Sequence, residues 1–163
     1  TLNEINRLIE QAIQDTRSLT FEISSPILYQ FGLEAAVEWL TEQIRDQHGI
    51  PCEFRDDGRP KPLDEDVKVL LYQAARELLI NVVKHAQAHS VKVSIIREGN
   101  DMRITVEDDG VGFDTSDISS LWSRSEGFGL FSIRTRLDHL GGQLDIQTKP
   151  GHGTRVNLVV PLK

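Results

Sequence analysis

The stretch from Asp64 to Val83 constrains the fold most strongly, because apolar residues occupy most of its faces when it is drawn as a helix. Asp64 stands at its start, where a carboxylate can cap a helix. The apolar residues recur at three- and four-residue spacing, as Val67, Leu70, Leu71, Ala74, Ala75, Leu78, Leu79, Val82 and Val83. A helix that is apolar on most faces must be covered by other elements. We therefore expect it to lie at the centre of the domain.

Two different periodicities define the other elements of this domain. Apolar residues at helical spacing predict helices over residues 33–47 and 130–140. Apolar stretches that are short or alternate with polar residues predict strands over residues 50–54, 91–95, 102–106, 143–148 and 154–160. Helices and strands are mixed without a regular βαβ alternation. The sequence thus predicts an α+β fold, a two-layer α/β sandwich with helices on one face of a mixed, mostly antiparallel sheet.

A long amphipathic helix is predicted ahead of this domain, from Thr1 to about Ser24. Its apolar stripe consists of Leu2, Ile5, Leu8, Ile9, Ala12, Ile13, Leu19 and Ile23. The helix stops before Pro26, because proline disfavours helical backbone in the residue that precedes it. Nothing in the segment itself covers the stripe. We expect such a helix to pair with another helix or with a second subunit.

The composition disfavours several classes of protein. The chain has 163 residues, with 18 Lys and Arg against 25 Asp and Glu, and a formal net charge of −7. This charge and the lack of a basic block argue against general nucleic-acid or membrane-surface binding. No apolar run reaches the roughly 18 residues of a membrane span, and residues 1–10 lack a signal-peptide pattern. Since residue 1 is not Met, we interpret the sequence as a piece of a longer chain, and its single cysteine, Cys52, fits a reducing cytoplasm.

Three polar residues interrupt the apolar helix. Glu77, Asn81 and Lys84 stand at positions i, i+4 and i+7, so they should project from one face of an α-helix. A carboxylate, an amide oxygen and an ammonium group suit a magnesium-phosphate group, with Asn81 as metal ligand and Glu77 ordering a water or acting as a base. Lys84 would offset phosphate charge. A solvated stripe with an ordinary helical ion pair explains the same residues equally well.

Three pairs of glycines follow this helix in the sequence. Asp108-Asp109-Gly110-Val111-Gly112 ends a predicted strand, Gly127-Phe128-Gly129-Leu130 precedes a predicted helix, and Gly151-His152-Gly153-Thr154 precedes the last strand. Glycine permits close approach of the backbone to a ligand, and a carboxylate at a strand end can accept a hydrogen bond from an amine. Free amides at a helix start favour phosphate. Each pair alone is explained by a turn, but three in this order point to a nucleotide site.

With these motifs, residues 60–163 resemble the GHKL ATPase superfamily and, within it, the catalytic domain of sensor histidine kinases. Residues 77–86 resemble the N box, residues 108–112 the G1 box, residues 127–130 the G2 box, and residues 151–154 the last Gly-x-Gly-Thr element. The resemblance implies the Bergerat ATP-binding fold with Mg²⁺ and ATP as ligands. Residues 115–126 would then form the ATP lid.

The resemblance also implies a role for each matching residue. It places Asn81 on Mg²⁺ with Glu77 beside it, and Lys84 and His85 at the phosphates. It places Asp108 at the adenine amino group, with Thr154 supporting it, and Gly112 in the adenine pocket. The implied catalytic positions are Glu77, Asn81 and Lys84. The implied nucleotide-binding positions are Asn81, Lys84, His85, Asp108, Gly110, Gly112, Gly127, Gly129, Leu130 and Thr154.

Segments outside these motifs resemble the nitrate/nitrite-sensor group of histidine kinases. The similar segments are Arg17-Ser18-Leu19, Pro26, Leu28, residues 32–36 and Lys84-His85-Ala86, whereas Ser24-Ser25-Pro26 departs from the Leu-Arg-Pro common there. The resemblance implies that residues 1–30 are the second helix of a dimerisation region with its connector, and that residues 31–163 are the catalytic domain. The whole protein would be a homodimer that transfers a phosphoryl group to a histidine and then to a response regulator. This region would lie in the cytoplasm, and the resemblance leaves open whether the whole protein is anchored in a membrane.

No phosphoacceptor is recognisable among the five histidines. None of His48, His85, His89, His139 and His152 is followed by the Asp or Glu expected beside an acceptor in this group. The chain is therefore predicted to bind nucleotide without phosphorylating itself. Two alternatives remain open at this point: a GHKL ATPase or serine kinase of the anti-sigma type, and a non-catalytic regulatory or dimerisation module.

Overall fold

A computed structural model defines residues 1–23, 25–117 and 128–163. The helices are α1 (Leu2–Ile23), α2 (Pro26–Phe31), α3 (Leu33–His48), α4 (Glu65–Asn81), the π-helix η1 (Val82–Ala86) and α6 (Phe128–His139). The strands are β1 (Cys52–Asp56), β2 (Val91–Glu98), β3 (Asp101–Asp108), β4 (Gln143–Thr148) and β5 (Thr154–Pro161). Each predicted helix and strand is present, with ends shifted by a few residues.

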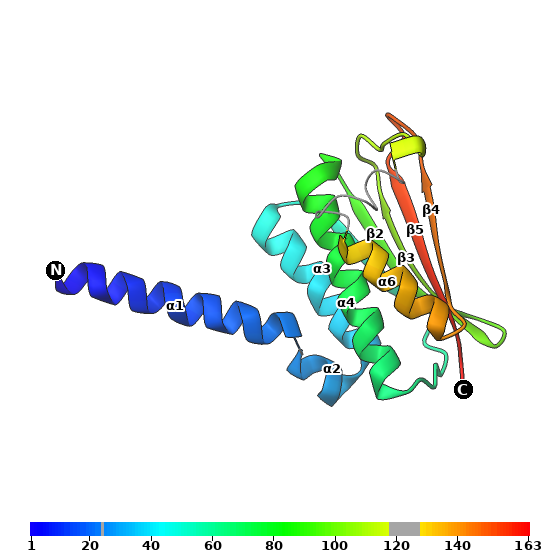
Figure 1. Cartoon of the computed structure of the whole chain (residues 1–163), viewed down its shortest axis with the longest axis horizontal. Coiled ribbons are helices and arrows are strands. Elements are labelled where there is room, and N and C mark those ends of the chain that lie inside the picture. Colours follow the sequence, from blue (N-terminus) through cyan, green and yellow to red (C-terminus); the bar gives the residue numbers. More distant parts are fainter. Residues whose placement is uncertain (24, 118–127) are drawn as a thin grey trace.

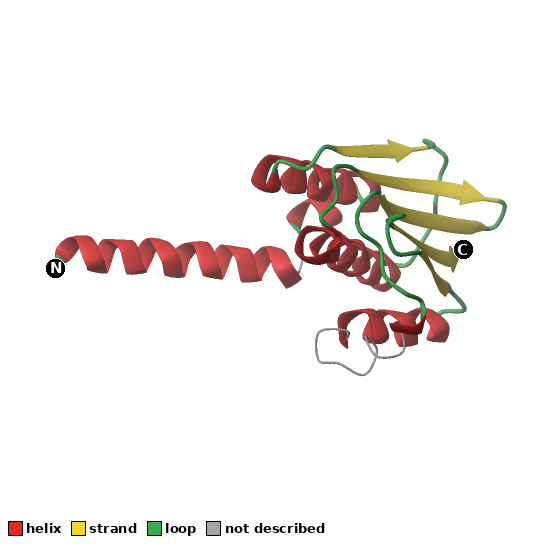
Figure 2. Cartoon of the chain, turned by 90° about the horizontal axis from the view of Figure 1, so that it is seen from above, coloured by secondary structure: helices red, strands yellow, loops and turns green. Residues whose placement is uncertain are grey.

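The five strands form one sheet in the order β1-β2-β3-β5-β4. β1 runs parallel to β2, and the other neighbours are antiparallel. Helices α3, α4 and α6 cover one face of this sheet, while the other face has no helical layer in the described parts of the chain (Figures 1 and 2). The predicted two-layer sandwich with a mixed, mostly antiparallel sheet is confirmed.

Helix α4 occupies the centre of the helical layer, as its apolar faces predict. Leu71, Ala74 and Ala75 are fully buried in it, and they pack into a core that β2, β3 and β5 share. Asp64 takes the N-cap position, but its side chain accepts no capping hydrogen bond, and its carboxylate instead pairs with Lys163. The capping role expected for Asp64 is therefore wrong.

The C-terminal end of α4 changes from an α-helix to a π-helix. The α-helix ends at Asn81, and the π-helix η1 continues from Val82 to Ala86. Gln87 then adopts a left-handed conformation, with φ of 49°, and the chain turns towards β2. A π-helix is closed by i→i+5 hydrogen bonds and occurs often at functional sites.

Helix α1 extends away from the sandwich (Figure 1). The side chains of its predicted stripe that the structure describes are exposed, including Leu2, Ile5 and Leu8. None of the described helices combines the length and the apolar character that crossing a bilayer demands. The pairing predicted for α1 stays a prediction.

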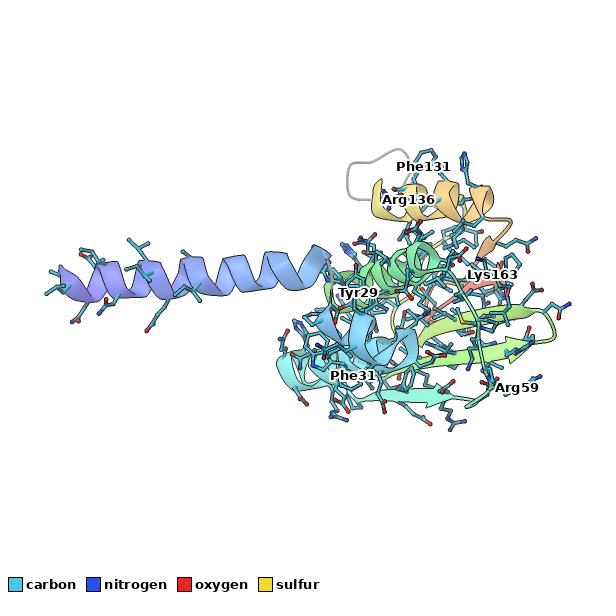
Figure 3. All side chains as sticks on the ribbon, turned by 90° about the horizontal axis from the view of Figure 1, so that it is seen from below. Tyr29, Phe31, Arg59, Phe131, Arg136 and Lys163 are labelled. Carbon is cyan, nitrogen blue, oxygen red and sulfur yellow. The ribbon has the colours of Figure 1, made fainter. Side chains whose placement is uncertain are left out.

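Helix α2 was not predicted from the sequence. Pro26 stands in its first turn, where a missing N–H and a fixed φ are tolerated. Leu28 anchors it in the core, whereas Tyr29 and Phe31 are exposed next to the junction with α1 (Figure 3). The proline that ends α1 therefore also starts a new helix.

Candidate functional site

A cavity of about 370 Å³ lies between the end of α4 and the sheet. Within the described part of the chain it is lined by Leu78, Asn81, Val82, His85, Ala86, Val106, Asp108, Gly112, Phe113, Leu130, Ile146, Thr154 and Val156. Most of these side chains are apolar, and the polar ones come from four different segments. Small-molecule sites typically have about 300–1,000 Å³ and this kind of lining.

Asp108 is the buried carboxylate of this cavity. It ends β3, is 7% exposed, and accepts a hydrogen bond of 2.8 Å from the Gly110 amide. Burial raises the pKa of Asp108 above its ordinary value, although hydrogen bonds from the Gly110 and Thr154 amides act in the opposite direction. The negative charges of Asp109 and Glu107 add to the increase. A buried carboxylate with oxygens at a cavity wall can accept hydrogen bonds from an amine.

Two glycines allow the chain after Asp108 to pack closely. A β-carbon at Gly110 would collide with the backbone carbonyl of Ala86, at the end of η1. Gly112 has φ of +60°, and a β-carbon there would collide with the carbonyl of Lys149. Between them, the Val111 amide donates to the Ala86 carbonyl over 2.7 Å. Gly110 and Gly112 therefore bring this loop against both neighbouring segments, and Gly112 lines the cavity itself.

Thr148 connects two of the glycine segments, and it was missed in the sequence. Its hydroxyl accepts a hydrogen bond of 3.1 Å from the Phe113 amide and lies 3.1 Å from the Gly153 carbonyl. It also lies 3.0 Å from the hydroxyl of Thr154, its partner in the β4–β5 register. The register of the predicted hairpin was the only sequence signal that could have pointed to Thr148.

Asn81 and His85 line the cavity, whereas Lys84 is exposed and does not line it. Glu77 does not line the cavity either, so the single face predicted for Glu77, Asn81 and Lys84 stays a prediction, and the helix becomes a π-helix after Asn81. A π-helix rotates by a smaller angle about its axis per residue than an α-helix, because its hydrogen bonds join residues five positions apart. Three residues after Asn81 therefore fall short of the cavity face, and four residues reach it.

Glu77, which does not line the cavity, packs against Gly129 of the second glycine pair. A β-carbon at Gly129 would come within 2.8 Å of the Glu77 carboxylate, so a larger residue there would displace the end of the Glu77 side chain. Leu130 lines the cavity. Because α6 begins at Phe128, Phe128 and Gly129 lie in its first turn and not ahead of it as predicted, while Leu130 lies in the helix as expected. Gly127 and most of the predicted lid, from residue 118 onward, lie outside the described residues.

The oxygen atoms near Asn81 suit a magnesium ion. An amide oxygen on Asn81 and the carboxylate of Glu77 are hard donors of the kind that Mg²⁺ prefers. The described residues contain no cluster of three or more His, Cys, Asp or Glu side chains that could hold a metal by itself. Magnesium usually keeps waters and takes one or two protein ligands together with substrate phosphates. The residues present fit such a shared shell.

The sequence matches a known protein family over most of the sandwich. The profile of the family described as "Histidine kinase-, DNA gyrase B-, and HSP90-like ATPase" matches residues 66–163. An uncharacterized sensor-like histidine kinase of Chloroflexus aurantiacus is 29% identical over 99% of this chain and 28% of its own length. The oxygen sensor histidine kinase NreB of Staphylococcus carnosus is 29% identical over 97% of this chain and 44% of its own length. The chain thus spans less than half of these two relatives.

A solved structure shares the fold. The histidine kinase domain of a blue-light activated histidine kinase from Erythrobacter litoralis superposes on 80% of this chain and 61% of its own, with a TM-score of 0.63 and 23% identity. The architecture of α3, α4, α6 and the sheet is therefore one that is already known from experiment.

Proposed function

Because the chain belongs to the family of histidine kinase-, DNA gyrase B- and HSP90-like ATPases, we propose that it is the ATP-binding catalytic core of a two-component sensor histidine kinase. The observation that carries this proposal is the cavity that joins Asn81 and His85 on one wall to Asp108 and Thr154 on the other. Similarity to two sensor kinases over nearly the whole chain supports the kinase assignment within the family.

Adenine binds, on this proposal, at the Asp108 wall. The Asp108 carboxylate accepts a hydrogen bond from the exocyclic amine, and the apolar side chains of Val106, Ile146 and Val156 contact the ring. Gly112 leaves room for the base, and Thr154 holds Asp108 through its backbone amide. The apolar walls and the single buried acceptor favour a flat base that carries an amine.

The phosphates extend towards the Asn81 wall. Asn81 and Glu77 would hold Mg²⁺, which neutralises phosphate charge when bound. His85 lines the cavity, and Lys84, the exposed residue before it in the chain, would add positive charge near the phosphates. The amides in the first turn of α6, around Gly129 and Leu130, offer further donors to phosphate oxygens.

The reaction transfers the γ-phosphoryl group of ATP to a histidine. The bond between the γ-phosphorus and its bridging oxygen breaks, a phosphorus–nitrogen bond forms, and ADP leaves. Catalysis of this kind rests mainly on positioning and charge stabilisation, which the cavity residues provide. The phosphoryl group then passes to an aspartate of a response regulator.

The acceptor histidine lies, on this proposal, outside the five histidines of this sequence. The exposed stripe of α1 pairs in a homodimer of the whole protein. The catalytic region works in the cytoplasm, where ATP is available, and it does not bind nucleic acid directly. The chain alone binds nucleotide and does not phosphorylate itself.

Calorimetric titration with a non-hydrolysable ATP analogue, with and without Mg²⁺, tests the nucleotide site. Asp108→Asn should weaken binding about 10- to 100-fold, since hydrogen bonds to charged groups contribute about 1.5–3 kcal/mol. Asn81→Ala should remove the dependence on Mg²⁺. Asp145→Asn is the matched control, because this exposed aspartate adjoins Ile146 on β4 but faces away from the cavity. Folded wild-type protein that binds no analogue would overturn the proposal and favour a regulatory module.

Incubation with γ-labelled ATP distinguishes a histidine kinase from an ATPase and from a serine kinase. We expect no label on this chain and transfer to a histidine when the acceptor region of the same protein is added. Steady release of phosphate that requires Glu77, or label on a serine of a partner protein, would instead support an ATPase or a serine kinase.

A further inference from the structure

Asp109, the second acid of the first glycine segment, contacts a different part of the molecule from Asp108. It is exposed and does not line the cavity. One of its carboxylate oxygens accepts hydrogen bonds of 2.8 Å from the amides of both His89 and Ser90. The other oxygen accepts a hydrogen bond of 3.0 Å from the Ser90 hydroxyl. One carboxylate thus takes up three donors from the turn that joins η1 to β2.

This turn is the continuation of the helix that carries the Asn81 wall. The chain runs from Asn81 through η1 to Gln87, whose left-handed conformation leads directly into the turn at His89 and Ser90. Asp109 holds the far end of that segment, and the Val111 amide holds Ala86. Both anchors stand within three residues of Asp108. The two walls of the cavity are therefore tied together immediately behind Asp108.

We propose that Asp109 is a positioning residue for the nucleotide, whose carboxylate sets the separation between the Asp108 wall and the wall formed by Asn81 and His85. This assignment rests on the proposed function, because only a ligand that spans both walls depends on their separation. ATP spans them, with its base at Asp108 and its phosphates at Asn81. Adenosine, which has no phosphates, contacts only the Asp108 wall.

The difference between these two ligands supplies the test. Affinities for adenosine and for a non-hydrolysable ATP analogue with Mg²⁺ are measured by titration on the wild type and on Asp109→Ala. We expect the variant to bind the analogue about tenfold more weakly, because it loses hydrogen bonds to a charged group. Binding of adenosine should change less than about twofold, since the Asp108 wall is intact. Amide exchange at His89 and Ser90 should accelerate in the same variant.

Conservative and control variants separate positioning from general damage. Asp109→Asn keeps an oxygen for both backbone amides, and its amide group can donate to the Ser90 hydroxyl, so it should restore analogue binding to within about twofold. Asp145→Ala removes another exposed, hydrogen-bonded aspartate on the outer face of the sheet and should leave both affinities unchanged. Should Asp109→Ala fail to fold, Ser90→Ala removes one of the three hydrogen bonds and should reduce analogue affinity about two- to threefold.

The possible results are distinct. Wild-type protein that binds neither ligand overturns the proposed function, and the assignment of Asp109 with it. Wild-type protein that binds both, with Asp109→Ala weakening them equally or weakening neither, overturns the assignment of Asp109 alone. Failure of Asp109→Asn to recover analogue binding would also contradict the assignment.

Discussion

Asp108 and Asp109 are neighbours in the chain, yet their surroundings are opposite. Asp108 is buried at the cavity wall, where loss of hydration raises its pKa. Asp109 is exposed, and hydrogen bonds from Ser90 and His89 lower its pKa. The charge of the first therefore opposes folding, while the charge of the second supports it. Of this pair of identical side chains, one lies at the cavity wall and the other holds a neighbouring turn.

The end of strand β3 produces this division. Successive side chains on a strand point to opposite faces. Asp108 is the last residue of β3 and points into the cavity, and Asp109 follows it and points to the turn at residues 89–90. The two carboxylates therefore contact different parts of the molecule. Burial of the Asp108 charge thus disfavours the folded state, while the hydrogen bonds to Asp109 favour it.

The largest loss of stability and of analogue affinity is expected at Gly110, because a substitution there disturbs both the segment that carries Asp108 and the end of η1. In Gly110→Ala the new β-carbon meets the Ala86 carbonyl, which is backbone and cannot turn aside. Forcing extra volume into a packed site costs about 1–3 kcal/mol in the free energy of unfolding. Analogue affinity should fall by at least about tenfold, because the Asp108 wall and η1 are pushed apart.

Gly99→Ala is the control for this change. Gly99 lies in the β2–β3 turn with φ of +63°, and an alanine there would meet nothing within 4 Å. It should lower stability through backbone strain alone, by about 1–2 kcal/mol, while analogue affinity stays unchanged. Equal loss of affinity in the two variants would show that strain, and not the contact with Ala86, governs binding.

A smaller effect, of opposite sign at the two carboxylates, is expected in the dependence of stability on pH. A raised pKa means that folded Asp108 binds its proton more tightly than the unfolded chain, so its contribution to stability falls as pH rises through that pKa. A lowered pKa means that Asp109 contributes stability above the unfolded pKa, and that this contribution is lost as pH falls through the folded pKa.

Urea unfolding between about pH 3 and 8 measures both contributions. Asp108→Asn should be as stable as the wild type or more stable near neutral pH, and this advantage should disappear in acid. Asp109→Asn should be less stable than the wild type near neutral pH, and this deficit should disappear in acid. Differences of the same sign in the two variants would contradict the division of roles.

The smallest effect on affinity is expected at Thr148, which contacts the cavity residues Phe113 and Thr154 but does not line the cavity itself. Thr148→Val removes the hydroxyl that joins the Phe113 amide to the Gly153 carbonyl. The loss of about 1 kcal/mol typical of a hydrogen bond should lower analogue affinity about two- to fivefold. Thr148→Ser keeps the hydroxyl and should bind like the wild type. Equal affinities for all three proteins would show that the link between the glycine segments is dispensable.

Much of the site could be predicted from the order of its motifs. Asn81, Asp108, Gly112, Leu130 and Thr154 were all predicted to bind nucleotide, and all line one cavity. The side chains that meet there lie on segments whose local patterns are strong: an apolar helix, a strand end and a strand start. The chemistry assigned to each residue stays a prediction.

The residues that could not be predicted depend on contacts between distant positions. Lys84 and His85 were both expected at the phosphates, but of the two His85 lines the cavity and Lys84 does not, because a π-helix follows Asn81. The apolar pattern of residues 82–86 fits either kind of helix. Asp109 was recognised only as the neighbour of Asp108, because its partners stand about 20 positions earlier in the chain. Thr148 acts only once β4 and β5 are in register.

The sequence by itself determined the elements of this protein apart from α2 and the π-helix η1, the central place of α4 and the segments that build the cavity. These properties follow from the spacing of apolar residues and from short motifs of glycine and polar residues. Both can be recognised within a short stretch of sequence. The tertiary structure alone decided which side of the helix end faces the cavity, which of two adjacent acids is buried, and how the walls are held apart. Those outcomes are set by hydrogen bonds and close contacts between segments, which exist only when the chain has folded.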